Sequence, residues 1–351
     1  MEGAYMRMNR RTGLAGLGLA LVALLAVSAC NPAAPSASGD SGENNKVTIG
    51  VGGQVLLSYL PTTLAAQLGY YKEEGLDVEL QDLQAGSKAL TAMIGGSTDV
   101  TCGYYEHTIQ VQSKKQEIQA LVTMLKLPGL VLAVSPKSVS SISSVKDLKG
   151  KVVGVTAPGG STDFFLKYLL SKNGMAADDV SVAAVGGGST AVAAMEEGKV
   201  QAAVMLDPAV AQLEKRAGQL KVLYDLRTVA GVESVYGTSS YPAAVLYAKS
   251  AWLEQNPETA RKLARAITRT LEWIAAHDGA EIAAKMPASY AAGDPELYAK
   301  AIDLAKPGFT LDGKMPTDGP EAVLDTQRVS NPEMKGVDVD LSKTFTNRFV
   351  E

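Results

Sequence analysis

The sequence predicts an α/β protein of two doubly wound lobes, joined by two crossing segments with a ligand cleft between them. The main observation is a passage that occurs at residues 86–96 and again at 188–198, with Gly, Ser, Ala, Ala, Met and Gly in register. Strand-like segments precede and follow both copies. We therefore expect two copies of a β-α-β-α-β unit, and a cleft between two such lobes commonly holds a small ligand.

Each copy of the repeat is expected to form one short helix. Its apolar positions recur at helical spacing, and Ser87 and Ser189 stand where an N-cap would be. A closing Gly can take the left-handed conformation that ends a helix. Chance similarity between two Ala-rich helices is the alternative explanation.

The segments around the repeats supply the expected strands and crossings. Each unit should contain buried strands on either side of its repeat, at 47–51 and 99–103 in the first unit and at 151–155 and 201–205 in the second. The chain is expected to cross between the lobes at 130–134 and to return at 235–247. A long helix from Pro257 through Trp273, with one apolar face, then completes the first lobe. The tail from Pro307 is expected to wrap the surface.

The first thirty residues have the pattern of an export signal. A basic start is followed by an apolar run from Leu14 to Val27 and by small residues before Cys30. The Cys at this place resembles the lipobox of bacterial lipoproteins, which implies a signal peptide at 1–29 and a diacylated Cys30. An uncleaved membrane anchor is the alternative, although the run is short for a span of ~20 residues. Residues 30–45 are expected to form a flexible tether.

Composition excludes several classes of protein. The 351 residues carry a formal net charge of −4, and the basic residues are scattered, so we expect no nucleic-acid partner. No later apolar run could span a bilayer, so the mature chain is expected to be a soluble monomer held at the membrane through its lipid anchor only. Cys102, inside an apolar strand, is expected to be a small buried hydrophobic residue.

Ligand contacts are expected beyond the carboxyl ends of the strands, where helices begin. The glycines at 159–160 and the helix start after them could bind an anion, although Asp163 could cap that helix or repel an anion. Tyrosines could stack on a flat ligand, and Asp207 could bind a ligand amine. Ordinary capping and packing roles are the alternatives. The candidate ligand-binding residues are Gln54, Tyr59, Ser87, Tyr104, Tyr105, Ser161, Thr162, Ser189, Asp207 and Tyr241.

The sequence gives little support to catalysis. There are two His, His107 and His277, and no metal-ligand spacing, Gly-x-Ser-x-Gly elbow or Walker pattern. His107 could act as a general base, but a lone His in a loop more often makes a structural hydrogen bond. We therefore predict no catalytic residue, no metal site and no cofactor.

One run resembles a known family. The sequence Gly-Tyr-Tyr-x-x-Glu-Gly-Leu-Asp-Val-Glu at 69–79 is similar to that of solute-binding proteins of ABC importers for sulfonates, taurine, nitrate and thiamine-type pyrimidines. The first repeat with the Asp-Val after it, and the segment 147–155, resemble the same family, so the similarity extends from about Val47 to His277. It implies a periplasmic binding protein-like fold of type II. Lobe 1 would comprise 46–132 plus 243–351, and lobe 2 would comprise 133–242.

The resemblance implies a non-enzymatic function. A lipid-anchored binding protein on the extracytoplasmic side of a bacterial membrane would capture a sulfonate, nitrate, pyrimidine or aromatic acid and deliver it to an ABC permease. Two alternatives remain. A fungal pyrimidine-precursor synthase family shares the fold but uses pyridoxal phosphate and a Cys-rich motif, which a single mature Cys besides Cys30 does not supply. The protein could also present its ligand to a membrane receptor as a sensor.

Overall fold

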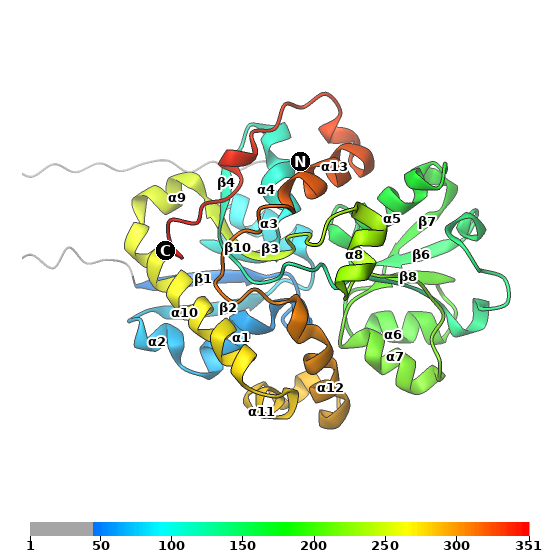
Figure 1. Cartoon of the computed structure of the whole chain (residues 1–351), viewed down its shortest axis with the longest axis horizontal. Helices are drawn as coiled ribbons and strands as arrows, with labels where there is room; N and C mark the ends of the chain where they lie inside the picture. The colour runs from blue at the N-terminus through cyan, green and yellow to red at the C-terminus, as the bar shows by residue number, and fades with distance from the viewer. Residues whose placement is uncertain (1–44, 351) are drawn as a thin grey trace, which may run out of the picture. The chain divides into compact units, whose positions relative to one another are not determined.

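The computed structural model describes residues 45–350, so the expected signal peptide, Cys30 and the tether up to residue 44 lie outside the described residues. Two five-stranded sheets form the framework (Figure 1). The first has the order β2 (Asp77–Asp82), β1 (Lys46–Val51), β3 (Val100–Tyr104), β10 (Ala244–Lys249) and β4 (Ile118–Thr123). The second has the order β7 (Ser181–Ala184), β6 (Val152–Val155), β8 (Ala202–Met205), β5 (Val131–Val134) and β9 (Val222–Asp225).

The two sheets follow the same plan. In the first, β1 runs parallel to β2 and β3, and β10 is antiparallel to β3 and β4. In the second, β6 runs parallel to β7 and β8, and β5 is antiparallel to β8 and β9. The strand that enters each sheet in the antiparallel direction lies in the same place in both. This correspondence confirms the predicted fold class of two similar α/β lobes.

Helices follow the strands in both lobes. Around the first sheet lie α1 (Leu60–Gln67), α2 (Tyr70–Glu73), α3 (Gly86–Ile94), α4 (Glu106–Gln110), α9 (Ser250–Gln255), α10 (Pro257–Ala276), α11 (Gly279–Lys285) and α12 (Pro295–Ala305). With the second sheet are α5 (Ser161–Lys172), α6 (Ser189–Glu196), α7 (Ala209–Ala217) and α8 (Val229–Tyr236), and α13 (Pro320–Ser330) follows near the C-terminal end. Short 3-10 turns lie at Leu57–Tyr59, Val111–Lys114, Pro136–Ser138, Val145–Leu148, Ala177–Asp179, Ala288–Ala291, Lys306–Gly308, Pro332–Met334 and Leu341–Lys343.

The long C-terminal helix behaves as its sequence predicts. Pro257 occupies the first turn of α10, where its missing N–H is no loss. The apolar stripe that includes Leu263, Ile267 and Leu271 is buried, and α10 contacts α1 and α2. Sequence from both ends of the described chain therefore builds the first lobe.

The two repeats form equivalent helices, α3 and α6. The closing glycines take left-handed angles, with φ of 80° at Gly96 and 72° at Gly198, as predicted. The N-cap predictions for the two serines are wrong. Ser87 is the second residue of α3 and Ser189 the first of α6, and neither helix has a side-chain cap. Each helix begins at or next to the preceding Gly, which places the hydroxyl inside the first turn.

The chain crosses between the lobes earlier than expected. Residues 131–134 form β5 and pair within the second sheet, so the first crossing falls at 124–130. The return crossing, 237–243, hydrogen-bonds to it: Tyr241 N donates to the carbonyl of Lys126 (2.8 Å), and Ala243 N donates to that of Leu125 (2.9 Å). The two crossings therefore form one paired connection.

The C-terminal segment adds a further link that the sequence did not suggest. Helix α13 contacts both α4 of the first lobe and α5 of the second. Just before it, the Asp318 carboxylate accepts hydrogen bonds from Thr238 (3.0 Å) and Ser239 (2.8 Å) and also from Ser240. The tail after α13 packs on the first lobe, where Phe345 forms a bridge with Ala120. Part of the tail is thus held between the lobes.

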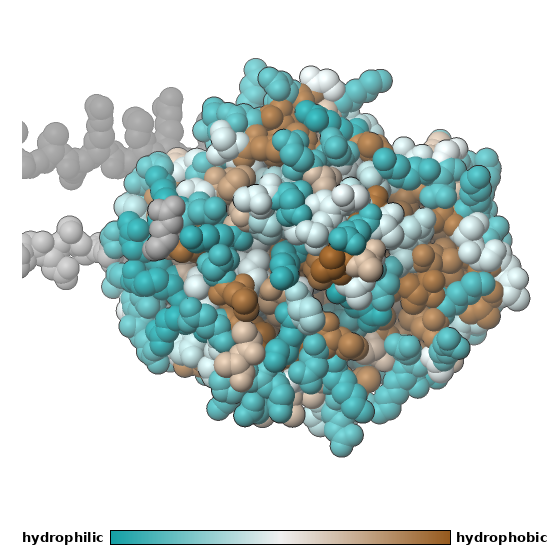
Figure 2. Space-filling model, in the orientation of Figure 1, coloured by the Kyte–Doolittle hydropathy of each residue, from teal (hydrophilic) through white to brown (hydrophobic). Residues whose placement is uncertain are grey.

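The surface of the described residues and the environment of the Cys102 thiol can be compared with the expectations from the sequence. Hydrophilic residues surround several apolar patches on the face in Figure 2, the widest of them on the right of the view. The large exposed apolar side chains of the described residues are Val139, Val222, Val229, Leu304, Leu311 and Val329. No helix within residues 45–350 is long and apolar enough to cross a membrane. Cys102 is fully buried beside the Thr62 hydroxyl (3.0 Å), and burial raises the pKa of its thiol to about 12. The prediction of a small buried residue is confirmed.

Candidate functional site

A groove opens between the loops of the two lobes. One wall comes from the loops after β1 and β2, and the other from the glycine-rich loop between β7 and α6. Its volume is about 280 Å³, and its lining comprises Gly53, Val55, Leu56, Asp82, Gln84, Gly186, Gly187, Gly188, Ser189 and Thr190. The loops that the duplication predicted to face one another therefore do so, and they leave space for a small molecule.

The lobes touch at one side of this groove. Leu57 N donates to the carbonyl of Asp207 (3.0 Å), which joins the loop after β1 to the end of β8. The Leu56 side chain packs on Gly187, where a Cβ would lie 2.9 Å from its Cδ2. A larger residue at 187 would push the Leu56 side chain away, so Gly187 permits the lobes to approach this closely.

The most unusual side chain between the lobes is Glu106, at the start of α4. It is 1% exposed, and neither carboxylate oxygen has a hydrogen-bond partner among the described residues. Burial raises its pKa to about 7, against smaller effects of its own backbone N–H and of the Ser161 hydroxyl on the second lobe. A buried charge without a partner is unfavourable, and Glu106 is a buried carboxylate of which both oxygens lack a partner within residues 45–350.

His107, the next residue, has a similar environment. Its Nδ1 shares a hydrogen bond with the Tyr247 hydroxyl (3.0 Å), while its Nε2 has no partner among the described residues. Burial lowers the pKa of the ring to about 4, so the imidazole is neutral near pH 7. Its Nε2 lies 4.0 Å from a carboxylate oxygen of Glu106. Two polar atoms that lack partners thus lie next to one another.

Small residues and a tyrosine surround His107. A Cβ on Gly86, the first residue of α3, would lie 3.0 Å from the His107 ring and 3.7 Å from the Tyr59 hydroxyl. A Cβ on Gly52 would lie 3.0 Å from the same hydroxyl. Tyr59 is itself buried, and burial raises its pKa, with a smaller contribution from Glu106. The loop after β1, the start of α3 and the start of α4 therefore converge here.

Among the candidates in the second lobe, Ser161 and Thr162 have different surroundings. Ser161 is half-buried and faces Glu106, as its effect on that pKa shows. The Thr162 hydroxyl oxygen accepts from Thr156 N (2.9 Å) and shares a hydrogen bond with the Thr156 hydroxyl (2.8 Å). Asp163 accepts from Gly159 N (2.8 Å), just before the helix, and from Lys167 (2.7 Å), and α5 has no side-chain cap. Of these three, only Ser161 is placed towards the other lobe.

The tyrosines do not form the expected pair. Tyr104 donates to the carbonyl of Pro128 (2.6 Å), shares a hydrogen bond with Ser58, and packs edge-on against Tyr59. Tyr105 instead contacts Thr344 and Phe345 in the C-terminal tail. Successive residues at the end of a strand point in opposite directions, which separates the two rings. A joint stacking surface for a flat ligand is therefore absent from this pair.

Tyr241 and Gln54 lie at other parts of the interface between segments. Tyr241, on the return crossing, is buried and stacks on Tyr236 with ring centroids 4.3 Å apart. The side-chain oxygen of Gln54 accepts from the Tyr290 hydroxyl (3.0 Å). Ser87 is half-buried beside Gly86, and Ser189 is exposed in the groove. The candidate ligand-binding residues therefore do not form one cluster. Some lie in or beside the groove, some lie near Glu106 and His107, and Tyr241 lies on the return crossing.

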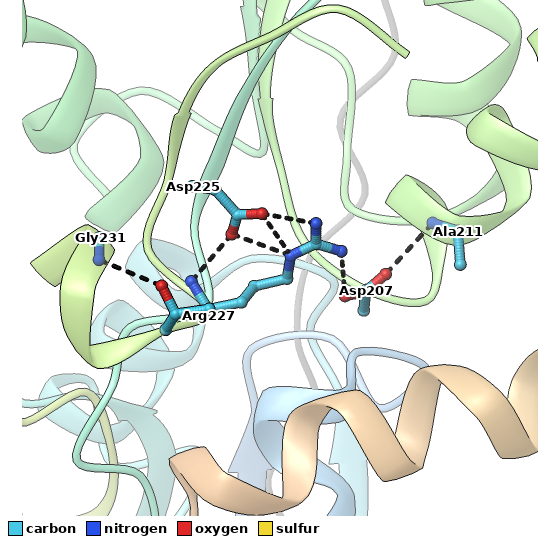
Figure 3. Close-up of polar contacts among 6 residues, drawn as sticks. Asp207, Ala211, Asp225, Arg227 and Gly231 are labelled. Carbon is cyan, nitrogen blue, oxygen red and sulfur yellow. Dashed lines mark hydrogen bonds and ion pairs between the residues drawn. The ribbon is translucent and has the colours of Figure 1, made fainter. Parts of the chain in front are cut away.

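Asp207 is held in a charged cluster of its own lobe (Figure 3). The Arg227 guanidinium lies between Asp225 (2.6 Å) and Asp207 (3.2 Å), and Asp207 also accepts from Ala211 N (3.2 Å). Burial raises the pKa of Asp207, although Arg227 opposes that effect. A ligand amine at Asp207 would therefore meet a carboxylate that Arg227 already pairs.

The sequence did not indicate Glu106 and His107, the neighbouring buried residues with unpaired polar atoms, as ligand contacts. Glu106 is not among the sequence candidates, and for His107 the sequence suggests a structural hydrogen bond or a general base. A signal was present: Glu106 and His107 interrupt an apolar stretch directly after a buried strand, at the carboxyl end where ligands bind. Over residues 45–350 no three His, Cys, Asp or Glu side chains come together in a group that could hold a metal ion.

Comparison with known proteins places this architecture in a family. A family model described as NMT1/THI5 like matches residues 58–280. The chain belongs to the NMT1/THI5-like family. A solved structure of a protein from Bordetella bronchiseptica RB50 is 39% identical, with a TM-score of 0.84, and the match covers 88% of this chain and 96% of that one.

The fold is also that of known binding proteins. The alkanesulfonate-binding protein SsuA from Xanthomonas axonopodis pv. citri, solved with bound MOPS, has a TM-score of 0.68 at 16% identity, covering 88% of this chain and all (100%) of that one. This confirms the resemblance to periplasmic binding proteins of the sulfonate and nitrate type as a similarity of fold.

Relatives of the NMT1/THI5-like family carry different names. The riboflavin-binding protein RibY of Chloroflexus aurantiacus is 26% identical over 322 residues, which is 87% of this chain and 86% of that protein. The 4-amino-5-hydroxymethyl-2-methylpyrimidine phosphate synthase of Aspergillus parasiticus is 24% identical over 315 residues, which is 87% of both. The relatives of this chain thus include proteins named as binders and proteins named as enzymes.

Proposed function

We propose that this protein is an extracytoplasmic solute-binding protein that captures a small molecule between its lobes and delivers it to an ABC permease. The groove between equivalent loops of the two lobes is the observation that carries the proposal. Similarity of fold to proteins titled as periplasmic binding proteins for sulfonates and nitrate supports it. The proposal includes a lipid anchor at Cys30, a signal peptide before it and a monomeric state.

The lobes would act as two bodies that close over the ligand. Loops of both lobes line the groove, and the paired crossings at 124–130 and 237–243 would act as the hinge. Gln54, Tyr59, Ser87, Ser161 and Ser189 are the sequence candidates that we propose as ligand contacts. Tyr104, Thr162 and Tyr241 would shape the cleft from behind.

A thermal-shift screen tests this function. The full chain, purified in detergent, would be heated with sulfonates, nitrate, pyrimidines, flavins and aromatic carboxylates. A ligand at ~1,000 times its dissociation constant adds ~4 kcal/mol to the free energy of unfolding, which is several degrees for a domain of this size. One strongly stabilising class is expected. A chain that carries no copurified molecule and responds to none of the compounds would contradict the proposal.

The second candidate function is enzymatic, because some relatives are named as pyrimidine phosphate synthases. Pyridoxal phosphate absorbs visible light when bound as an imine, so an absorption spectrum after incubation with it would reveal such a site. We expect no protein-bound band, since no Cys-rich motif is present in the sequence. A stoichiometric band would favour the enzyme.

A further inference from the structure

Two neighbouring side chains in the centre of the interlobe region lack the partners that buried polar groups normally have. The oxygens of Glu106 and the Nε2 of His107 are buried and make no hydrogen bond of ordinary geometry within residues 45–350, although the Ser161 hydroxyl lies near enough to Glu106 to lower its pKa. They come from consecutive residues at the start of α4, and Nε2 lies 4.0 Å from the carboxylate. Because most buried polar atoms are paired, this pair indicates a position where a hydrogen-bonding partner arrives from outside the chain.

The surroundings of the pair connect it to both lobes. Ser161, at the start of α5, faces Glu106 from the second lobe. Glu106 also contributes to the raised pKa values of Tyr59, Tyr104, Tyr241 and Tyr247, which burial raises first. No Lys or Arg among the described residues forms an ion pair with Glu106. A ligand that reaches Glu106 would therefore meet a carboxylate whose charge no Lys or Arg neutralises.

We propose that Glu106 and His107 select a ligand that donates hydrogen bonds, such as an amine, an amidine or a heterocyclic ring N–H, over an anion. An ionised carboxylate only accepts hydrogen bonds, and the neutral imidazole accepts or donates according to its tautomer. A sulfonate or nitrate placed against Glu106 would bring two negative charges together in a buried site. This inference rests on the proposed binding function and specifies its ligand class.

The test compares two kinds of probe on the same chain. Riboflavin and 4-amino-5-hydroxymethyl-2-methylpyrimidine carry N–H donors, whereas methanesulfonate and nitrate carry anionic oxygens and no N–H group. Titration calorimetry of the full chain in detergent would measure all four. We expect at least one donor probe to bind and the anions to bind at least roughly tenfold more weakly, because a hydrogen bond to a charged group is the stronger kind.

The variant Glu106→Gln separates a ligand contact from a structural role. It should weaken donor-probe binding roughly ten- to a hundredfold and leave the binding of methanesulfonate and nitrate unchanged or stronger. A variant that merely disturbed the fold would weaken both. Glu74→Gln is the matched control, because Glu74 is a largely buried carboxylate just after α2 that Arg265 of α10 already pairs at 2.7 Å. It should leave the binding of every probe unchanged.

The dependence on pH gives a second measurement. Donor-probe affinity should rise between pH 6 and pH 8 in the natural chain, as Glu106 ionises, and should be flat in Glu106→Gln. Glu106 interacts with Ser161 and with Tyr59, Tyr104, Tyr241 and Tyr247 and lies beside His107, and none of these groups changes charge in that range; α13, which packs against α4, also carries the charged residues Glu321, Asp325 and Arg328.

Three further results would count against the inference. Binding of methanesulfonate or nitrate that is tighter than that of both donor probes would overturn the inference while leaving the proposed function intact. Donor-probe binding that Glu106→Gln does not change would also overturn it. Binding of none of the four probes by a chain free of copurified ligand would count against both the inference and the proposed function.

Discussion

At the scale of single residues, Glu106 and His107 should oppose one another in the pH dependence of stability. Glu106 has a folded pKa of about 7 against an ordinary 4.5, and His107 about 4 against an ordinary 6.5. Between pH 4.5 and 6.5 the folded state binds an extra proton at Glu106 and lacks one at His107. As the pH rises, the effect of Glu106 therefore lowers the free energy of unfolding and the effect of His107 raises it. The two effects nearly cancel in the natural chain.

Single variants should expose the two opposite slopes. In Glu106→Gln the free energy of unfolding should rise by about 3 kcal/mol from pH 4 to pH 6.5, because only the His107 effect remains. In His107→Gln it should fall by a similar amount from pH 4.5 to pH 7. Urea unfolding at a series of pH values measures both. Equal slopes in the two variants would show that these groups are not buried as described.

Ser161 and Thr162 are neighbours that should respond differently to truncation. Thr162→Ala removes a buried hydroxyl that bonds to Thr156 N and Oγ1, so it should lower the free energy of unfolding by about 1–3 kcal/mol. Ser161→Ala should change stability little and weaken binding of whichever compound the thermal-shift screen identifies. Equal losses of stability, or unchanged affinity in Ser161→Ala, would contradict the assigned roles.

At the scale of elements, the loop contact at Gly187 offers a test of lobe approach. In Gly187→Val the new side chain would meet Leu56, whose Cδ2 lies 2.9 Å from the site of a Cβ. The contact lies between lobes, so ligand affinity should fall while unfolding of the lobes changes little. Adding Leu56→Ala should restore part of the affinity, since it makes room. A double variant as weak as Gly187→Val alone would argue against this contact in the closed state.

The elements themselves were largely predictable from sequence, and the site was not. The repeated Gly-Ser-x-Ala helix and the matching strands identified two equivalent units, because periodicity and glycine placement are local properties. The N-cap roles of Ser87 and Ser189 failed because the position where a helix begins depends on the preceding loop. The pairing of Asp207 with Arg227 and the contact of α13 with both lobes depend on residues distant in sequence, so no local pattern revealed them.

At the scale of the whole molecule, the anchor at Cys30 is a prediction about attachment rather than fold. Cys30→Ala removes the sulfur that would carry the lipid, so the chain should no longer be diacylated. Mass spectrometry of the natural chain should show the added mass of the lipid, and the variant should lack it. After cell fractionation, a smaller share of the variant than of the natural chain should stay with the membranes when these are extracted. A natural chain of unmodified mass would contradict the lipoprotein prediction.

The central claim is that two lobes close over a small molecule, and a distance between spin labels on the two lobes tests it most directly. Labels at Lys88→Cys on α3 and Glu197→Cys after α6 use exposed positions in the two repeat units, and the buried Cys102 should not react. Adding the compound that most stabilises the chain should shorten the distance and narrow its distribution. A distribution that the bound compound leaves unchanged would contradict closure, and with it the proposed mode of capture.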